Sequence, residues 1–491
     1  MRPGLFTLLC LIMVGGVLRA QDAPADIPLI PYESADFALQ ALRPDGWTQA
    51  AAGVFARASS PTDSTVILIQ SATAPRAAYE QSLAPQLLLD AFPAPDAQLI
   101  TAAFAWDLYR VDINAAGQQI TVSVALAATE ADDRTYAVLL QSTPDDHDTL
   151  REQIFLPVVE SVVAWAPEAV ATAYTSEDVT FSSGDLSLAG TITIPPGDGP
   201  FPAVAVVSGS GPSLRTGSLL PLADFNVYTT LADHLSSSGI VVLRYDDRGV
   251  GESEGDLATA TLDDLAQDAS GAVDYLRSRA EVDPARVGLI GHSEGGIIIP
   301  QVAANNAATT FLIALAGPAV DMTQVIAEQN RMLFSGMGLD AETVDAIAAQ
   351  FPLIQAAIIA GDDDAIRAEI ARLQTLQTGA EPSDTLINAG VAQFRALDTL
   401  GYWTYDVAGY WQQVGVPALA IFGGRDTQVS APQSAPALQE LLGDQATIVT
   451  FEAMNHVLQA AETGLPNEYA QLPAEIMPEV IDVLVEWINA R

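Results

Sequence analysis

The chain has 491 residues, of which 49% are hydrophobic, and its 61 acidic residues outnumber 20 basic ones, all arginine, for a formal net charge of −41. Such an acidic surface repels the phosphates of nucleic acid and of anionic membranes. Neither is therefore expected as a partner. The length is sufficient for two or three domains.

The first 20 residues, MRPGLFTLLCLIMVGGVLRA, combine an early arginine with an apolar run and a final alanine. This pattern predicts a secretory signal peptide over residues 1–20 and a secreted or extracytoplasmic protein. The alternative is an uncleaved membrane anchor, because Leu18 and Arg19 make a mediocre cleavage site. The single cysteine, Cys10, lies in this segment, so a cleaved chain has no disulfide and no cysteine nucleophile, and we expect no stable membrane embedding.

Residues 21–170 predict a small α+β domain whose role the sequence does not reveal. Alternating apolar and polar residues predict strands over Gly53–Ala58, Thr65–Gln70, Leu99–Ile113, Ile120–Ala128 and Thr135–Gln141. Helices are expected over Pro75–Phe92 and Asp148–Trp165. No catalytic cluster is recognisable here, and His147 in the polar PDDHD segment is expected to be solvated. Residues 166–174 are predicted to be a linker.

Residues 175–491 predict an α/β domain with a mostly parallel sheet. Val179–Phe181 and Leu186–Ile194 form a predicted hairpin. Buried strands are predicted over Ala203–Val207, Ile240–Tyr245, Val287–Ile290, Phe311–Leu315, Ala418–Phe422 and Thr447–Phe451. Most alternate with helical stretches, as parallel strands with crossover helices require. Residues 318–411 are mainly helical and predict a cap inserted over the carboxyl edge of the sheet.

The segment GHSEG, residues 291–295, fits the GxSxG nucleophile elbow, a sharp strand-to-helix turn with Ser293 at its tip. Glycines are expected beside such a turn because a side chain there would crowd the strand or the following helix. The five-residue motif is weak evidence alone, because serine also needs a base to accept its proton and an acid to orient that base.

His456, which follows the last predicted strand, is the candidate base, whereas His292 lies in the elbow itself and His234 ends a helix. For the acid, Asp426 follows the strand 418–422 in a GGRD turn, and Asp321 is the rival. The order serine, aspartate, histidine, each after a different strand, favours Asp426.

An oxyanion intermediate also needs fixed N–H donors. The N–H of Glu294, which follows the nucleophile, and that of Ser210, in the SGSGP loop after strand 203–207, are the candidates. Gly209 and Gly211 would let the backbone of this loop come close.

Five segments, in order, are similar to landmarks of the α/β-hydrolase superfamily, in its secreted esterase and serine-aminopeptidase-like (dipeptidyl-peptidase-like) branch. They are VVSGSGP, GIVVLRYDDRGVGESEG, the long run that ends in LIGHSEGG, PALAIFGGRDTQVS and MNHVL. The resemblance covers residues 180–489 and implies an α/β-hydrolase sheet with a helical cap insertion. It assigns Ser293 as nucleophile, His456 as base and Asp426 as acid, with Ser210 and Glu294 as oxyanion donors.

This resemblance implies an enzyme that cleaves carboxylic esters through an acyl-enzyme. Related chains also carry peptidase labels, so an aminopeptidase or dipeptidyl-peptidase-like enzyme acting on short peptides is the alternative. A noncatalytic extracellular binding protein on a hydrolase scaffold is the second alternative.

The segment SLRTG, residues 213–217, stands where such proteins commonly have a charged run, which puts substrate contact from that loop in doubt. Arg248 is expected to tie its loop together. Two alternatives stay open for a set of residues near the end of the cap: they line a pocket or they pack within the cap. The set comprises Phe394, Arg395, Tyr402, Trp403, Tyr405, Tyr410 and Trp411.

Metal and cofactor motifs are not recognisable in the sequence. It has no HxxxH, HExxH or clustered cysteine, and GVGESEG lacks the lysine of a phosphate-binding loop. Asp362–Asp364 is expected to be the solvated start of a helix. The sequence therefore predicts neither metal nor cofactor.

Overall fold

The computed structural model describes residues 27–34, 37–51, 53–57, 65–73, 75–87, 89, 91–115, 118–129, 134–165, 173–219 and 222–491. The predicted signal peptide and most of the predicted linker lie outside the described residues. The chain divides into unit 1, which comprises Met1–Val170 with Leu219–Asp224, and unit 2, which comprises Ala171–Ser218 with Phe225–Arg491.

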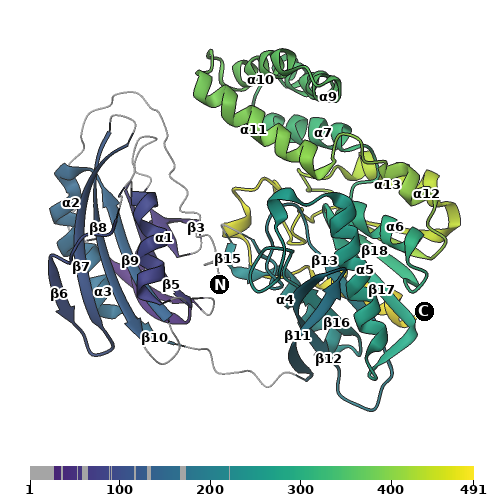
Figure 1. The fold of residues 1–491 in the computed structure, drawn as a ribbon, viewed down its shortest axis with the longest axis horizontal. Coiled ribbons are helices and arrows are strands. Elements are labelled where there is room, and N and C mark those ends of the chain that lie inside the picture. The colour runs from purple at the N-terminus through teal and green to yellow at the C-terminus, as the bar shows by residue number, and fades with distance from the viewer. Residues whose placement is uncertain are drawn as a thin grey trace. The chain divides into compact units, whose positions relative to one another are not determined.

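Unit 1 contains two antiparallel sheets with short helices (Figure 1). The larger sheet has the order β3-β4-β5-β9-β8-β7-β6, and the smaller has the order β1-β2-β10. The strands are β1 (Leu29–Ser34), β2 (Leu39–Pro44), β3 (Thr48–Ala51), β4 (Val54–Ala56), β5 (Val66–Thr73), β6 (Ala97–Ile100), β7 (Ala105–Ala115), β8 (Gln118–Thr129), β9 (Arg134–Ser142) and β10 (Val163–Ala164). The helices are α1 (Arg76–Leu83), α2 (Pro144–Leu150) and α3 (Leu156–Ser161), with a 3-10 turn at Ala84–Leu87 and a π-helical turn at Arg151–Phe155.

Alternation along the strands of the larger sheet gives it two buried faces. In β9, Val138 and Leu140 pack in the cluster that contains residues of α3, whereas Ala137 and Leu139 pack with residues of α1. Successive side chains of a strand point to opposite faces, so this sheet has a separate apolar core on each side.

Three expectations for unit 1 need correction. The single strand expected over 99–113 is two strands, β6 and β7, because Thr101 closes a turn in which its N–H donates to the carbonyl of Phe104. The first helix becomes a 3-10 turn after Leu83, where Pro85 cannot donate an i→i−4 hydrogen bond. The second helical stretch begins at Pro144 and ends at Ser161, before β10.

His147 is also placed differently from the expected solvated loop. It lies in α2 and is fully buried, with Nε2 2.8 Å from Ser123 Oγ and Nδ1 2.8 Å from Ser142 Oγ. Burial lowers the pKa of its imidazole to about 4. The polar neighbours in the sequence are therefore no guide to the position of this side chain.

Unit 2 is built on an eight-stranded sheet of order β11-β12-β16-β13-β17-β18-β19-β20. The first two pairings are antiparallel and the remaining ones are parallel. Its strands are β11 (Thr175–Ser183), β12 (Leu186–Ile194), β13 (Phe201–Val207), β16 (Val241–Tyr245), β17 (Val282–His292), β18 (Phe311–Leu315), β19 (Ala418–Gly423) and β20 (Ala446–Phe451). The sequence thus identifies every strand of this sheet, and the mostly parallel α/β architecture is confirmed.

Helices and short turns complete unit 2. The helices are α4 (Val227–Ser237), α5 (Leu262–Ser278), α6 (Gly295–Asn305), α7 (Met322–Gly336), α8 (Ala341–Ala348), α9 (Gln350–Ala360), α10 (Asp363–Thr378), α11 (Asp384–Leu400), α12 (Val407–Gln412), α13 (Ala431–Leu442) and α14 (Pro478–Asn489). Short elements are a two-stranded sheet of β14 (Ser218–Leu219) and β15 (Leu222–Asn226), and 3-10 turns at Leu257–Thr259, Gly443–Gln445 and Tyr469–Gln471.

Helices α5 and α6 contact each other and the central strand β17, while α4 contacts β16, β12 and α14. Successive residues of β13 face opposite sides of the sheet. Ala203 and Ala205 pack in the core cluster that contains residues of α5 and α6, whereas Val204 lies outside that cluster and is equally buried. Burial on both faces explains why the strand reads as a continuous apolar run.

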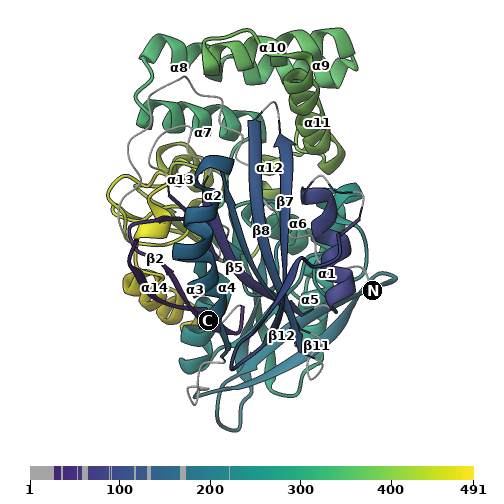
Figure 2. The same cartoon turned by 90° about the vertical axis from the view of Figure 1, so that its left-hand side faces the viewer.

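Helices α7 to α11 form a helical insertion between β18 and β19 (Figure 2). It has a core of its own, which includes Ile347, Phe351, Ile354, Ile370 and Phe394. The stretch Ala341–Ala360 is apolar enough to cross a membrane, but 44% of it is buried inside this insertion, as in a core helix. Asp362 is the N-cap of α10, and its side chain accepts a hydrogen bond from Ala365 N–H, as expected for a helix start.

Candidate active site

Ser293 lies at the turn between β17 and α6 with a φ of 54°, in the left-handed region that is costly for a residue with a side chain. Its N–H donates to the carbonyl of Leu315 over 2.9 Å. A Cβ at Gly291 would lie 2.3 Å from the carbonyl oxygen of Gly295, and one at Gly295 would lie 2.3 Å from that of Val207. The two glycines of GHSEG therefore permit the close packing that holds the strained serine.

Asp426 and His456 are brought together by the ends of neighbouring parallel strands, β19 and β20. His456 Nδ1 lies 2.9 Å from Asp426 Oδ2, and both residues are buried. The other carboxylate oxygen, Oδ1, accepts hydrogen bonds from the N–H groups of Gln428 at 2.7 Å and Val429 at 2.8 Å. The carboxylate is thus fixed by its own turn and leaves Nε2 of His456 as the free ring nitrogen.

Ser293 and His456 are not joined by a hydrogen bond between side chains in the described part of the chain. They are linked through His292, whose Nε2 lies 2.9 Å from the backbone carbonyl of His456. The rings of His292 and His456 have centroids 5.1 Å apart. The structure therefore brings the elbow and the histidine loop together at the carboxyl edge of the sheet.

Tyr228 on α4 extends this link to the loop after β13. Its hydroxyl accepts a hydrogen bond from Gly209 N–H at 3.0 Å and lies 3.2 Å from His292 Nδ1. Burial lowers the pKa of His292 to about 4, so its ring is neutral near pH 7. Because a carbonyl only accepts, His292 Nε2 carries the proton towards His456, and Tyr228 must donate to Nδ1. One buried bridge thus connects three loops.

The loop after β13 carries Ser210 beside Ser293. A Cβ at Gly209 would lie 3.2 Å from Ser293 Cβ, so the backbone of this loop comes close to the elbow. The N–H groups of Ser210 and Glu294 have no acceptor within the described residues. Two unpaired donors next to a nucleophile are what an oxyanion requires.

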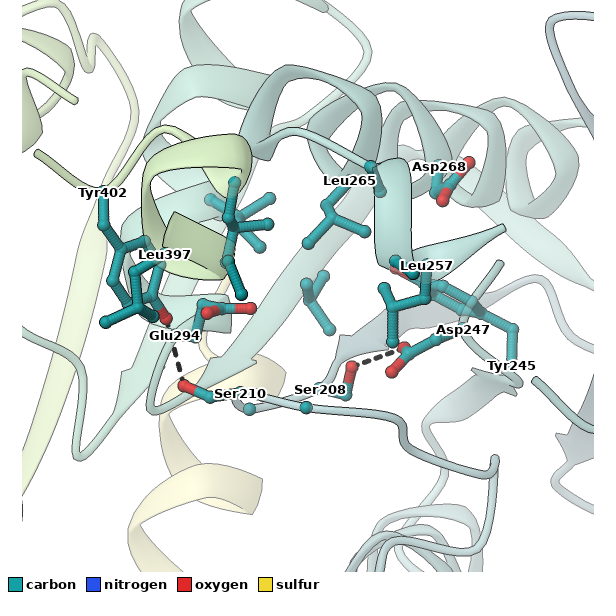
Figure 3. Close-up of a pocket in the computed structure, with 18 residues that line it drawn as sticks. Ser208, Ser210, Tyr245, Asp247, Leu257, Leu265, Asp268, Glu294, Leu397 and Tyr402 are labelled. Carbon is teal, nitrogen blue, oxygen red and sulfur yellow. Dashed lines mark hydrogen bonds between the residues drawn. The ribbon is translucent and has the colours of Figure 1, made fainter. Parts of the chain in front are cut away.

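Asp247 holds this loop in position. One carboxylate oxygen accepts from Ser208 Oγ at 2.6 Å and the other from Ser213 N–H at 2.8 Å (Figure 3). In the same view, Ser210 Oγ lies 3.1 Å from the hydroxyl of Tyr402 on the helical insertion. The loop is therefore tied both to the sheet edge and to the insertion.

Asp247 and Glu294 both line a cavity of about 240 Å³ beside the loop. Burial raises the pKa of Asp247 to about 7, and the nearby Asp268 and Asp246 add to this shift. Burial, together with the nearby Asp247, raises the pKa of Glu294 to about 8. Glu294 Oε2 is buried with no hydrogen-bond partner in the described chain. The Glu294 carboxyl is therefore mostly protonated at neutral pH.

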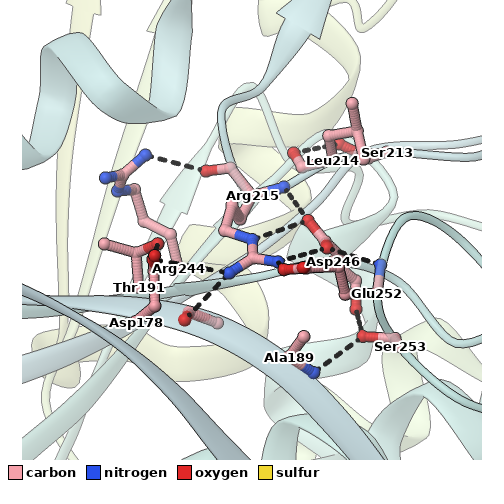
Figure 4. A network of polar contacts seen from close by, with 11 residues as sticks. Asp178, Ala189, Thr191, Ser213, Leu214, Arg215, Arg244, Asp246, Glu252 and Ser253 are labelled. Atoms are coloured by element: carbon pink, nitrogen blue, oxygen red, sulfur yellow. Dashed lines mark hydrogen bonds and ion pairs between the residues drawn. The ribbon is translucent and has the colours of Figure 1, made fainter. Parts of the chain in front are cut away.

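Arg215 of the SLRTG segment anchors the far end of the loop (Figure 4). Its Nε lies 3.0 Å from Asp246 Oδ1 and its Nη2 lies 2.8 Å from Asp246 Oδ2, and it also pairs with Glu252. Arg248 makes a second buried pair, with its Nε 2.7 Å from Asp268 Oδ2. Both arginines therefore hold loops together, as expected for Arg248.

A larger cavity of about 400 Å³ is lined by Ser293, Ser210 and Glu294 on the sheet side. Its other walls come from α7, α9, α10 and α11 of the helical insertion and from the turn after Asp426. Ser293 and Glu294 of the elbow and Ser210 of the loop after β13 thus face one cavity. Phe394 and Tyr402 line it as well.

Other candidates lie elsewhere. Asp321 is the exposed N-terminal residue of α7, 3.3 Å from Gln324 Nε2, and His234 is exposed in α4. Arg395 pairs with Asp363 on the outside of the insertion. Trp403 and Trp411 are buried in cores.

No group of three or more potential metal ligands occurs within the described residues. Reasoning from the sequence does not identify Tyr228, Asp247 or Asp246 as site residues. The adjacent acidic pair in RYDDR was the available signal for the two aspartates, since two carboxylates at a strand end need partners.

Known proteins resemble this chain in sequence. Residues 223–463 match a family described as serine aminopeptidase, S33. Esterase EstD of Thermotoga maritima is 30% identical over 304 residues, or 61% of this chain, which spans only 65% of that relative's length. The putative hydrolase YtaP of Bacillus subtilis is 31% identical over 114 residues, which cover 21% of this chain and 38% of YtaP.

Among solved structures, the Pyrococcus furiosus esterase Pf2001 is 16% identical with a TM-score of 0.41, over 66% of this chain and 94% of that one. The family match covers the elbow, the paired Asp426 and His456, and strands β16 to β20 of the sheet, but not β13, which precedes it in the chain. Over this region the chain is similar to α/β-hydrolases of the esterase and serine-aminopeptidase-like branch.

Proposed function

We propose that this protein is a secreted serine hydrolase that cleaves carboxylic esters of small molecules through an acyl-enzyme. The observation that carries the proposal is the pair His456 and Asp426, 2.9 Å apart, at the same sheet edge as the strained Ser293. The name of the relative EstD, an esterase, supports the choice of ester over amide.

Acylation begins when Ser293 Oγ attacks the ester carbonyl and His456 Nε2 accepts its proton. Asp426 keeps the opposite nitrogen, Nδ1, protonated and stabilises the imidazolium that forms. The N–H groups of Ser210 and Glu294 stabilise the negative oxygen of the tetrahedral intermediate. Its collapse breaks the ester bond, and His456 returns the proton to the departing alcohol.

Deacylation repeats these steps with water as the nucleophile. His456 accepts a proton from water, the hydroxide attacks the acyl-serine, and Ser293 leaves with the proton returned by His456. No step requires a metal or an organic cofactor.

The helical insertion acts as a cap over the larger cavity in this proposal. Helices α7, α9, α10 and α11 contribute walls to the space that Ser293 faces. Partial shielding by these walls reduces access of water to the acyl-enzyme and strengthens the hydrogen bonds to the oxyanion. Residues 1–20 direct export and are removed, and unit 1 is a separate domain with an unassigned role.

The test is a comparison of short p-nitrophenyl esters with aminoacyl p-nitroanilides. We expect the wild type to hydrolyse the esters, with Ser293→Ala and His456→Gln lowering kcat by roughly 10⁴-fold or more. Preference for the anilides would make the enzyme a peptidase. Failure of the folded protein to cleave either would favour a noncatalytic scaffold.

The acid is tested separately. Asp426→Asn is expected to lower kcat strongly, because the amide favours the wrong tautomer of His456. Asp321→Asn is the matched control, since Asp321 is exposed on α7. The reverse pattern would assign the acid to Asp321.

A further inference from the structure

The larger cavity has an unusual lining for such an acidic protein. Its polar wall consists mainly of six carboxamide side chains: Gln329, Asn330, Gln374, Gln377, Gln393 and Gln428. Carboxamides carry both donors and acceptors and no charge. This wall lies across the same cavity as Ser293 and therefore contacts whatever is attached to the reacting carbonyl.

Three of these carboxamides have their nitrogen engaged and their oxygen free. Asn330 Nδ2 donates to the carbonyl of Ile326 at 2.8 Å, Gln374 Nε2 to that of Leu386 at 2.9 Å, and Gln428 Nε2 to the hydroxyl of Tyr469 at 3.3 Å. Gln374 Oε1 is buried and has no partner in the described chain. Carboxamide oxygens in the cavity wall that accept no hydrogen bond favour a ligand able to donate to them.

The remaining glutamines add further capacity. The side chains of Gln329, Gln377 and Gln393 make no hydrogen bond to another described residue. Each therefore offers both a donor and an acceptor to an occupant of the cavity. A ligand that matches this wall must itself carry several groups able to donate and accept.

The position of Gln374 depends on a glycine on the neighbouring helix. A Cβ at Gly390 of α11 would lie 2.8 Å from Gln374 Nε2 and 2.7 Å from Ile370 Cγ2. The close approach of α10 and α11 therefore holds this side chain in its position along the cavity wall.

Charge is nearly absent from the lining. Glu294 is the one ionisable acidic or basic residue in it, and its burial raises the pKa of this carboxyl to about 8, so it is mostly uncharged near pH 7. Phe351, Phe394 and Tyr402 add aromatic surface. Uncharged hydrogen-bonding groups beside aromatic rings suit a neutral ring that carries hydroxyls better than a bare hydrocarbon or an ion.

We propose that this cavity binds an uncharged polyhydroxylated part of the ester substrate, the size of one monosaccharide. The proposal rests on the proposed esterase function and specifies its substrate class. Hydroxyls donate to the oxygens of Asn330 and Gln428, to which no described residue donates, and exchange hydrogen bonds with the other carboxamides of the wall. A cavity of about 400 Å³ accommodates such a group together with the acyl part.

The test compares 6-O-acetylglucose with cyclohexylmethyl acetate, which has the same ring size and the same primary ester but no hydroxyls. We expect the wild type to have the higher kcat/KM for the sugar ester. Gln374→Leu and Gln329→Leu should each lower the ratio of the two kcat/KM values by roughly three- to tenfold. Gln439→Leu, an exposed glutamine on α13 that does not line the cavity, is the matched control and should leave the ratio unchanged.

Equal or greater kcat/KM for cyclohexylmethyl acetate, an unchanged ratio in both cavity variants, or a marked preference for the cationic ester acetylcholine would overturn the proposal. Ligand-observed NMR on Ser293→Ala tests it without turnover, because 6-O-acetylglucose should bind more tightly than cyclohexylmethyl acetate, and the reverse order would also overturn it. Absence of turnover of every acetate, with the sugar ester still binding more tightly, would instead refute only the esterase function.

Discussion

Ser293 keeps a φ of 54° because its neighbours leave no alternative space. The position of Gly295 against Val207 is one such constraint, since an added Cβ would lie 2.3 Å from the carbonyl oxygen of Val207. The strain at the nucleophile is thus maintained by backbone packing between the elbow and β13.

Gly295→Ala should therefore lower the free energy of unfolding by roughly 2–4 kcal/mol, in the range of overpacked or strained core positions. Gly415→Ala is the control, because a Cβ at Gly415 meets nothing within 4 Å and its φ is not positive. Urea unfolding would measure both. Equal effects of the two substitutions would contradict this account of the elbow.

The hydroxyl of Tyr228 joins the loop after β13 to His292, so we expect Tyr228 to act as a positioning residue. Tyr228→Phe keeps the ring but leaves Gly209 N–H and His292 Nδ1 without this partner. We expect kcat to fall about tenfold with a smaller change in KM, as steady-state kinetics would measure. A change confined to the free energy of unfolding, with kcat preserved, would make the bridge purely structural.

The raised pKa of Glu294 predicts a stability that falls with pH. Between its ordinary value of 4.5 and about 8, the folded carboxyl keeps a proton that the unfolded one has released. Raising the pH through this window therefore favours the unfolded chain. The lowered pKa values of His292 and His147, both about 4, act in the opposite direction, but only below about pH 6.5.

From about pH 6.5 to about pH 8, Glu294 should thus reduce the free energy of unfolding by on the order of 2 kcal/mol. Urea titrations at several pH values measure this slope. In the Glu294→Gln variant this side chain cannot ionise, so the free energy of unfolding should fall less steeply with pH. Part of the slope should remain because Asp247 also has a raised pKa. Parallel slopes in the two proteins would contradict the assignment.

Among individual residues, sequence alone predicts those that lie in motifs and misses those that act through packing. Ser293, Asp426 and His456 each follow a strand in a recognisable turn, and the structure pairs the last two. Tyr228 and Gln374 lie on ordinary helices, so their relevance depends on which loop or cavity each helix meets in three dimensions. Their catalytic and binding roles remain predictions.

At the level of elements, the parallel sheet was predictable because a strand buried on both faces is a continuous apolar run between turns. The antiparallel strands of unit 1 were harder. The turn at Thr101 lies between two strands with similar composition and carries no glycine or proline, so β6 and β7 read as one strand. The expectation that His147 is solvated is wrong, because a segment with polar residues all around does not indicate which side of a short helix is buried.

The helical insertion has its own core, so its stability should be separable from that of the sheet. Ile354→Ala removes a fully buried side chain from that core and should cost about 2–5 kcal/mol locally. Hydrogen exchange should then be faster in α8 to α11 while β13 and β17 stay protected. Uniform loss of protection across unit 2 would show that the insertion and sheet unfold together.

For the whole molecule, units 1 and 2 have separate apolar clusters and separate sheets. Residues 173–491 expressed alone should therefore fold and hydrolyse short p-nitrophenyl esters with kcat within about threefold of the full chain. Circular dichroism would report folding and steady-state kinetics the activity. An inactive but folded fragment would mean that unit 1 contributes to the catalytic site.

The central claim is that Ser293 is a nucleophile activated by His456 and Asp426. The most direct measurement is intact-mass and peptide-mapping mass spectrometry after treatment with a fluorophosphonate, which phosphonylates an activated serine. The account predicts one adduct per chain, located on Ser293, that is absent from Ser293→Ala and strongly slowed in His456→Gln. An adduct on another serine, or no adduct on a folded wild-type chain, would contradict it.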